Sequence, residues 1–317
     1  MTRERDAETP EIASGYRFRA LDGLELRRER ARVTAARLGL KGTVLLAPEG
    51  VNFSVWGRPE AIDGWLGFLD EELDCGDVVL NRQPCPEPPF LRLKVRLRPE
   101  IVTFDPDIDP HRTPAVHVED PTAWNRLLTR EDVQVVDTRN DYEVRIGSFE
   151  GARNPGTGSF AEFKDYVSRE LDPDRPVAMF CTGGVRCEKA GAWLRSAGFD
   201  EVYQLHGGIL GYLARVSPDA SRWNGECFVF DDRVSVDASL EPTGRVVCIG
   251  CREPAAGIDE SGVPPFDDSG RCRICERSFD AAQVASLRER ARQVRLAAER
   301  GERHLGPQAG IEGDPGQ

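Results

Sequence analysis

The chain has 317 residues, enough for two or three domains, and 39% of them are hydrophobic, which suffices for buried cores. No apolar run approaches the ~18–20 residues that cross a bilayer, and the N-terminus has no apolar stretch typical of a signal peptide. The net charge of −12 repels nucleic acid on average, so any contact with RNA must come from local basic faces. We therefore expect a cytoplasmic protein without membrane contacts, whose nine cysteines indicate metal or redox chemistry rather than disulfides.

The first 105 residues predict a ferredoxin-like (split βαβ) domain. Residues 1–13 are polar and expected to be disordered, and the order β-α-β-β-α-β with one extra strand then spans 14–105. The expected elements are a strand at 16–19, a helix at 25–38, a hairpin of strands at 42–47 and 51–56, a helix from Pro59, and strands at 78–80 and 91–97. Helices then cover one face of the sheet and leave the other face open.

The last of these strands alternates strictly between apolar and basic residues. Its leucines and Val95 would face the helices, so its basic side chains would line the open face. These candidates for contacts with RNA phosphates are Arg92, Lys94, Arg96 and Arg98. A solvated strand face paired with neighbouring acids explains the same segment equally well.

After a linker at 106–122, residues 123–220 alternate strands with helices. The strands are expected at 133–139, 177–180 and 202–205, and the helices from Trp124 and at 160–171, 187–197 and 209–216. This order predicts a doubly wound parallel α/β sheet, whose active site lies at the carboxyl ends of its strands. Asp137 and Arg139 close the first strand, where they either support an active-site loop or form a structural salt bridge.

A six-residue loop, Cys181-Thr182-Gly183-Gly184-Val185-Arg186, separates the second strand from the next helix. A thiol there faces the free N–H groups of a helix N-terminus, and two glycines let the amides turn inward around an anion. These amides and the Arg186 guanidinium favour thiolate over thiol, so Cys181 is the predicted nucleophile. Cys187 is a candidate to resolve a persulfide or sulfenic acid on Cys181, or else a buried core residue.

This part of the chain resembles a rhodanese domain. The resemblance rests on Asp137-x-Arg139, Gly151-Ala152, the Cys181 loop and Leu205-x-Gly207-Gly208. The spacing Cys-x4-Arg is that of rhodanese loops, which are sized for a sulfur atom. Cysteine phosphatases of related shape use Cys-x5-Arg, so a phosphatase or arsenate reductase is an alternative that the spacing disfavours.

Residues 221–300 predict a small extension that binds zinc. Two pairs, Cys248-x2-Cys251 and Cys272-x2-Cys275, are twenty residues apart, which matches the four-cysteine zinc ribbon; such a closed site is structural. A redox dithiol pair and an iron–sulfur centre are the competing interpretations. We also expect a strand–turn–strand extension of the sheet at 223–234, a helix at 280–300 and a disordered tail at 301–317.

In this order the parts resemble the bacterial rhodanese-domain tRNA uridine hydroxylases. The resemblance is carried by residues 40–52, 92–96, 136–143, 180–190 and 225–231 and by the two cysteine pairs. It implies an oxidoreductase that uses O2 to hydroxylate the wobble uridine of tRNA at C5, giving 5-hydroxyuridine. The sequence shows no flavin fingerprint and no facial triad for iron, and it names neither the electron donor nor the oligomeric state.

Three functions therefore follow from the sequence. In the hydroxylase, Cys181 adds to uridine C6 or carries a transient oxidised sulfur, while Arg186 and the loop amides stabilise the anion. In a sulfurtransferase, Cys181 carries a persulfide. In the third, the chain is a zinc-bearing RNA-binding module whose thiol has no catalytic role.

Overall fold

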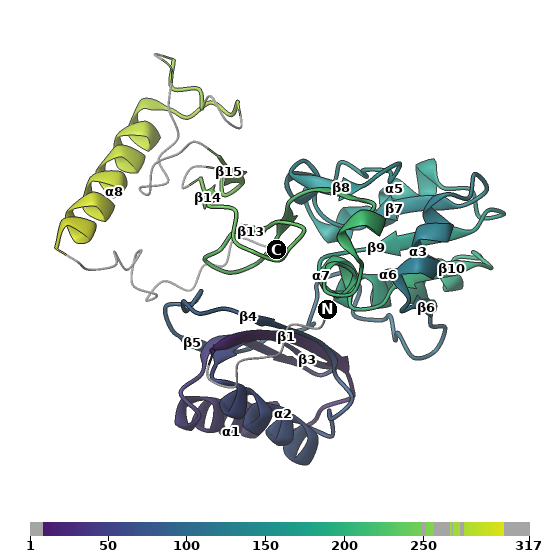
Figure 1. The fold of residues 1–317 in the computed structure, drawn as a ribbon, viewed down its shortest axis with the longest axis horizontal. Helices are drawn as coiled ribbons and strands as arrows, with labels where there is room; N and C mark the ends of the chain where they lie inside the picture. The colour runs from purple at the N-terminus through teal and green to yellow at the C-terminus, as the bar shows by residue number, and fades with distance from the viewer. Residues whose placement is uncertain (1–8, 249–250, 257–266, 268, 273–275, 301–317) are drawn as a thin grey trace. The chain divides into compact units, whose positions relative to one another are not determined.

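The computed structural model of the chain describes residues 9–248, 251–256, 267, 269–272 and 276–300 (Figure 1). These residues form two compact units. One runs to Cys227 and includes Ala238–Leu240, and the other comprises Phe228–Asp237 and the chain from Glu241 onward. Among the described helices, none has the length and apolar character needed to span a membrane.

The first unit begins with a five-stranded sheet in the order β4-β1-β3-β2-β5. Its strands are β1 (Glu11–Phe18), β2 (Lys41–Ala47), β3 (Gly50–Gly57), β4 (Val79–Pro84) and β5 (Leu93–Leu97). Helices α1 (Leu24–Arg37) and α2 (Pro59–Leu73) lie on one face, as Figure 1 shows. Phe53 and Trp65 pack between the sheet and α2, and the predicted ferredoxin-like domain is confirmed.

Two features of this domain differ from the sequence prediction. Strand β1 starts at Glu11, inside the segment expected to be disordered, because Ile12 and Ala13 are both buried, in different core clusters. The face opposite the helices is not open throughout, since Tyr16 is buried there in a cluster with Ile101. Strand β1 therefore begins well before Tyr16, and its residues are less exposed than their composition implied.

A second sheet of four parallel strands follows, in the order β6-β10-β9-β7. The strands are β6 (Val116–Val118), β7 (Gln134–Asp137), β9 (Val177–Phe180) and β10 (Val202–Leu205). The helices are α3 (Pro121–Leu128), α4 (Asp141–Val144), α5 (Phe163–Glu170), α6 (Val185–Ser196) and α7 (Gly208–Leu213), with short 3-10 turns at Phe160–Glu162 and Pro218–Ala220. The predicted doubly wound parallel sheet is confirmed.

Both faces of this sheet are covered. Along β9, Val177 and Met179 pack with the apolar sides of α5 and α6, while Phe180 points to the other face. There Phe180 joins an aromatic cluster that includes Trp124 and Phe149. A strand has two faces, so a run of four buried apolar residues is typical of this central position.

The predicted extension of this sheet at 223–234 is wrong. Strand β11 (Trp223–Gly225) pairs with β8 (Gly147–Phe149) in a separate two-stranded sheet. The second unit contains short strands and one long helix: β13 (Ser235–Val236), β14 (Val246–Val247), β15 (Pro254–Ala255) and α8 (Ala281–Glu299), with β12 (Cys227–Phe228) preceding them. The predicted tail at 301–317 lies outside the described residues.

Candidate active site

Cys181 follows β9 directly and begins the loop that leads into α6. Gly184 caps this helix with φ of 104°, a conformation that favours glycine. The first amides of α7 hold the loop from the other side: Ile209 N–H donates to the Cys181 carbonyl at 2.9 Å. A Cβ at Gly208 would lie 2.5 Å from that carbonyl oxygen, so the approach requires a glycine. The Gly207–Gly208 pair therefore fixes the loop on the end of β10.

The Cys181 thiol is surrounded by hydrogen-bond donors. The Gly184 N–H donates to Sγ at 3.1 Å. Burial by itself favours the neutral thiol, but the Cys187 thiol, the Arg186 guanidinium and the backbone N–H groups of Arg186 and Cys187 outweigh it and lower the pKa of Cys181. The arrangement stabilises a thiolate at the carboxyl end of a parallel strand.

Cys187 lies on the first turn of α6 and is fully buried beside Cys181. Burial and the neighbouring Cys181 raise the pKa of the Cys187 thiol, so this sulfur stays protonated and donates its hydrogen to Cys181. The Thr138 hydroxyl lies 3.6 Å from the Cys187 sulfur and donates to the Phe180 carbonyl at 3.0 Å. The structure thus brings the two thiols together.

The Arg186 guanidinium is paired with a carboxylate rather than directed at the sulfur alone. Its Nη1 and Nη2 donate to Oε1 and Oε2 of Glu143, each at 2.8 Å, and Glu143 is completely buried on α4. Thr182 Oγ1 donates to the same carboxylate at 3.4 Å. This bidentate pair fixes the loop, and the guanidinium charge, after the Cys187 thiol and ahead of the loop amides, also lowers the pKa of Cys181.

Asp137 and Arg139 form a second buried bidentate pair. The Nε and Nη2 of Arg139 donate to the Asp137 carboxylate at 2.8 and 2.7 Å. Arg139 Nη2 also donates to the Gly147 carbonyl at 2.6 Å, and its guanidinium lies over the Trp223 ring. These contacts tie the end of β7 to β8 and β11. The pair borders the loop through Thr138, and its hydrogen bonds are those of a structural salt bridge.

The N-terminal domain covers part of the loop. Tyr16 of β1 donates its hydroxyl hydrogen to Oε1 of Glu188 on α6 at 2.8 Å. A Cβ at Gly184 would lie 2.8 Å from the Tyr16 oxygen, so this hydroxyl rests against the loop backbone. Cys181 is only 1% exposed. Space around Gly183 is open, with no atom within 4 Å of a Cβ built there.

A buried lysine anchors the two domains next to this contact. Lys189 of α6 is 0% exposed, and its Nζ lies 2.7 Å from Glu49 Oε2 and 2.5 Å from Glu100 Oε2. Burial raises the pKa of Glu49, although Lys189 opposes this change. One cation between two carboxylates from the N-terminal segment therefore fixes α6, and with it the Cys181 loop.

The sequence patterns predicted no role for Tyr16, Glu143, Glu188 or Lys189. For the three charged residues the signal was a charge near an expected core: Glu188 and Lys189 lie at the start of the helix after the Cys181 loop, and Glu143 lies in the first turn after a buried strand. A charged residue at such a position is buried only when it has a partner. The partners come from distant segments, so the sequence alone does not identify them.

The basic residues of β5 lie along the edge of the first sheet. Lys94 and Arg96 are exposed, while Leu93, Val95 and Leu97 pack against the helical core, so the predicted alternation is confirmed. Arg92 is exposed just before the strand, and Arg98 is half-buried after it. Cross-strand pairing places Arg96, Leu45, Asn52 and Tyr16 in one row. Residues paired in this way point to the same face, so the basic edge and the cover of the loop share a surface.

Three of the four predicted zinc ligands lie together. Cys248, Cys251 and Cys272 belong to one buried cluster, whereas Cys275 lies outside the described residues. Within the part of the chain that the structure describes, no three potential ligands are arranged as a metal site.

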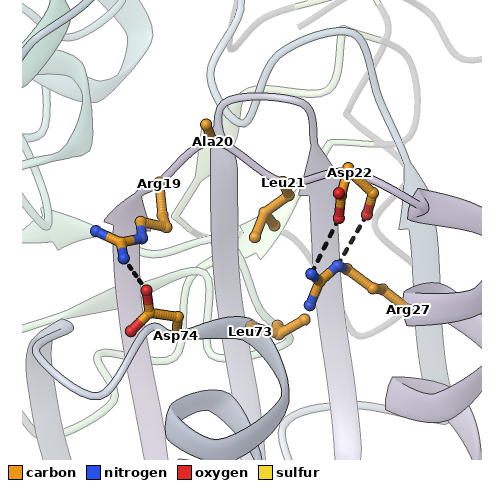
Figure 2. A pocket seen from close by; sticks show the side chains of 7 residues that line it. All are labelled: Arg19, Ala20, Leu21, Asp22, Arg27, Leu73 and Asp74. Atoms are coloured by element: carbon orange, nitrogen blue, oxygen red, sulfur yellow. Dashed lines mark hydrogen bonds and ion pairs between the residues drawn. The ribbon is translucent and has the colours of Figure 1, made fainter.

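A pocket of about 440 Å³ lies elsewhere in the N-terminal domain, between the end of β1 and the end of α2. Figure 2 shows its two arginines facing carboxylates, Arg19 toward Asp74 and Arg27 toward Asp22. Because both guanidinium groups are already paired and the Cys181 loop does not line it, this pocket takes no part in the candidate chemistry.

Several solved structures are similar to parts of the chain. The Alr3790 protein from Anabaena sp. is 24% identical with a TM-score of 0.29, over 33% of this chain and 90% of that one. An acylphosphatase from Coxiella burnetii is 22% identical with a TM-score of 0.22, over 30% of this chain and 100% of its own. A polysulfide-sulfur transferase from Wolinella succinogenes is 26% identical with a TM-score of 0.27, over 31% and 73%. Scores this low carry no argument about function.

Two family models match the chain in the order of its domains. The model of the UPF0176 acylphosphatase like domain matches residues 10–101, and that of the rhodanese-like domain matches residues 120–215. The first range contains the sheet that covers the loop, and the second contains Cys181 and every helix around it. The chain therefore belongs to the UPF0176 rhodanese-domain family.

Proposed function

We propose that this protein hydroxylates C5 of the wobble uridine in tRNA, with the Cys181 thiolate as its nucleophile. The observation that carries the proposal is the thiol itself, held by the Gly184 N–H and the Cys187 thiol in a loop that lowers its pKa. The UPF0176 and rhodanese domains support the family context, and the sequence resemblance described above supports the substrate.

The chemistry begins with the attack of a thiolate on an electron-poor carbon. The sulfur of Cys181 forms a bond to uridine C6, and the electron pair of the C5=C6 bond moves to C5 and O4 as an enolate. Hydroxylation then takes one atom of O2 onto C5 and releases the other as water, with two electrons and two protons supplied by a reductant. The loop amides stabilise the sulfur anion before attack and after release.

The sheet of the N-terminal domain fits an approach by RNA. The row of paired residues that starts at Arg96 on β5 crosses β2 and β3 and reaches Tyr16 on β1. Three strand-to-strand steps of about 4.8 Å make this distance roughly 14 Å. Neighbouring rows add polar side chains, including Ser14, Ser54 and Thr43 in line with Lys94. In the proposal, the basic edge holds phosphates while a base reaches the loop beside Gly183.

In the same proposal the C-terminal cysteines hold a structural zinc ion. The N–H of Cys248 and that of Cys272 each donate at 2.9 Å to the carbonyl of the fifth residue after it. The fourth residue after each cysteine, Arg252 or Glu276, has a positive φ, of 68° and 60°. This shared hydrogen-bonding pattern of Cys248 and Cys272 suits four thiolates around one tetrahedral ion, with Cys251 and Cys275 as the other two ligands.

Anaerobic and aerobic reactions of the purified protein with unmodified tRNA test the function. We expect 5-hydroxyuridine, measured by nucleoside mass spectrometry, only with O2 and a reductant, and none from Cys181→Ser. The matched control is Cys227→Ser, another buried thiol, which should retain activity. Unchanged wobble 5-hydroxyuridine in a deletion strain without a paralogue would contradict the proposal, and retained hydroxylation by Cys181→Ser would favour the non-catalytic RNA-binding role.

A sulfurtransferase is the second candidate, favoured by the Cys181–Cys187 contact. Attack of the Cys187 sulfur on a Cys181 persulfide would form a disulfide and release hydrogen sulfide, with no other reactant. Mass spectrometry of the Cys181 peptide after treatment with thiosulfate tests this role. A gain of one sulfur atom, or a Cys181–Cys187 disulfide after attack by Cys187, without any hydroxylation of tRNA would establish it in place of the hydroxylase.

A further inference from the structure

A chain of hydrogen-bonding side chains leads from the Cys181 loop toward solvent. Tyr16, which rests on Gly184, donates to Glu188 Oε1 at 2.8 Å, and the other oxygen of Glu188 lies 3.4 Å from Nε2 of His117. Nδ1 of His117 in turn lies 3.1 Å from Nδ1 of His206. The side chain of His117 is 32% exposed. The chain joins β1, α6, β6 and the residue that follows β10, and it ends at the partly exposed His117 and His206.

The charges along this chain favour proton movement outward. Burial favours neutral Glu188, but hydrogen bonds with His117, Tyr16 and Gln204 outweigh it and lower its pKa, so the carboxylate is an acceptor. Burial and Glu188 raise the pKa of Tyr16, which therefore stays a hydroxyl. Its hydrogen points to Glu188, so its oxygen lone pairs are left to face the loop.

The two histidines differ in proton affinity. The hydrogen bond to Glu188 raises the pKa of His117, whereas burial and the neighbouring His117 lower that of His206. The remaining charged groups acting on them are Glu119 on both, and Arg215 and Glu188 on His206. His117 is therefore the natural acceptor after Glu188, and His206 passes protons only in exchange with solvent.

We propose that Tyr16 is the general base for the uridine C5 proton, and that Glu188 and His117 are positioning residues that carry this proton to solvent. The inference rests on the proposed attack of Cys181 at C6. It also explains why a second domain reaches into the loop: the rhodanese domain supplies the nucleophile, and the acylphosphatase-like domain supplies the base.

The proton step balances without an oxidant. After the C6–S bond forms, the enolate takes a proton from solvent at C5, which then carries this proton and its original hydrogen. For release, the original C5 hydrogen moves as a proton to the Tyr16 oxygen while the Tyr16 proton moves to Glu188 Oε1. The C5 electron pair restores C5=C6, and the C6–S bond breaks to return the thiolate. When C5 carries a hydroxyl as well as the hydrogen, the same removal gives 5-hydroxyuridine.

This reversible addition predicts exchange of the C5 hydrogen with solvent in the absence of O2. Full-length protein and unmodified tRNA are incubated anaerobically in D2O, and deuterium at uridine C5 is measured by nucleoside mass spectrometry. Tyr16→Phe keeps the ring on Gly184 and removes only the hydroxyl. We expect it to lower the exchange rate at saturating tRNA by about 100-fold, within the range for a general base, with KM unchanged. Glu188→Gln should lower the same rate by at least about tenfold, for loss of its acceptor.

Two controls separate this role from a structural one. Tyr203→Phe removes a hydroxyl that also donates to a glutamate, Glu201 at 2.9 Å, and should leave exchange unchanged. Alkylation of Cys181 should keep its rate and pH profile in Tyr16→Phe, which shows an intact thiolate. Near-wild-type exchange rates in both Tyr16→Phe and Glu188→Gln would overturn the role of Tyr16 as base and leave the attack of Cys181 at C6 in place. Absence of exchange in the wild type would overturn the attack at C6 and the base together.

Discussion

Cys181 and Cys227 are both buried, at 1% and 0% exposure, yet their surroundings favour opposite protonation states. Burial raises the pKa of Cys227 to about 12, and the nearby Arg139 only partly opposes it. Around Cys181 the same penalty is outweighed by donors from the loop, and its pKa falls. The difference shows that the neighbouring Cys187 thiol, the Arg186 charge and the loop N–H groups, rather than exposure, set which thiol ionises.

The largest expected effect is the contrast in reactivity itself. At pH 7.5 a thiol with a pKa of about 12 is ionised to about 1 part in 30,000, whereas one below the free-thiol value of about 8.5 is ionised to at least about a tenth. We expect iodoacetamide to modify Cys181 at least about 1,000-fold faster than Cys227, measured by peptide mass spectrometry. Similar alkylation rates for Cys181 and Cys227 would contradict the proposed difference in their ionisation.

A second test removes the buried ion pair that fixes the N-terminal domain next to the Cys181 loop. Lys189→Met leaves Glu49 and Glu100 without their buried cation, so the free energy of unfolding should fall by about 3–5 kcal/mol. Lys164→Met is the matched control, because its pair with Asp105 is partly exposed and should cost about 0–1 kcal/mol. Urea titrations measure both, and equal losses would contradict the role of the buried anchor.

A smaller effect should follow from displacing one N–H group. Gly184→Ala places a Cβ 2.8 Å from the Tyr16 oxygen at a φ of 104°, which costs about 1–3 kcal/mol and shifts the donor to Cys181. Alkylation of Cys181 at pH 7.5 should slow by about tenfold. Gly183→Ala, next to it, meets no atom within 4 Å and should react as the wild type does. Slow alkylation of Gly183→Ala together with fast alkylation of Gly184→Ala would show that the Gly184 N–H is not the donor that controls Cys181.

The smallest effect concerns the pH dependence of stability. Glu188 raises the folded-state pKa of His117, so the contribution of this pair is complete below the unfolded pKa of about 6.5 and is lost as pH rises through the folded value. His117→Gln should therefore lower Tm more at pH 5.5 than at pH 8.5, by differential scanning fluorimetry. Equal losses at the two pH values would show that the pair is not charged.

Most of the framework was predictable because it follows local patterns. The run Val177–Phe180, the glycine pair after Cys181 and the alternation around Val95 gave the strand, the loop and the basic edge from residue order alone. Residues of β6 and β8 were not predicted as strands, since three-residue strands carry too little pattern.

The contacts that complete the site were not predictable, because each joins residues far apart in the chain. Tyr16 and Glu188 are separated by 172 positions, and Lys189 and Glu100 by 89. Nothing local distinguishes Tyr16 from an ordinary strand tyrosine. The carboxylate partner of Arg186, Glu143, was missed for the same reason.

The anchor at Lys189 has a consequence for how this protein can be divided. A fragment that begins at the rhodanese domain would leave the ammonium group of Lys189 on α6 without its two carboxylates. It would also lack Tyr16, which rests against Gly184 in the Cys181 loop. The surroundings of Cys181 in such a fragment differ from those in the full chain, even though every atom of the loop is retained. Exchange of the thiol-bearing domain between relatives should therefore succeed only when the N-terminal segment that carries Tyr16, Glu49 and Glu100 is transferred with it.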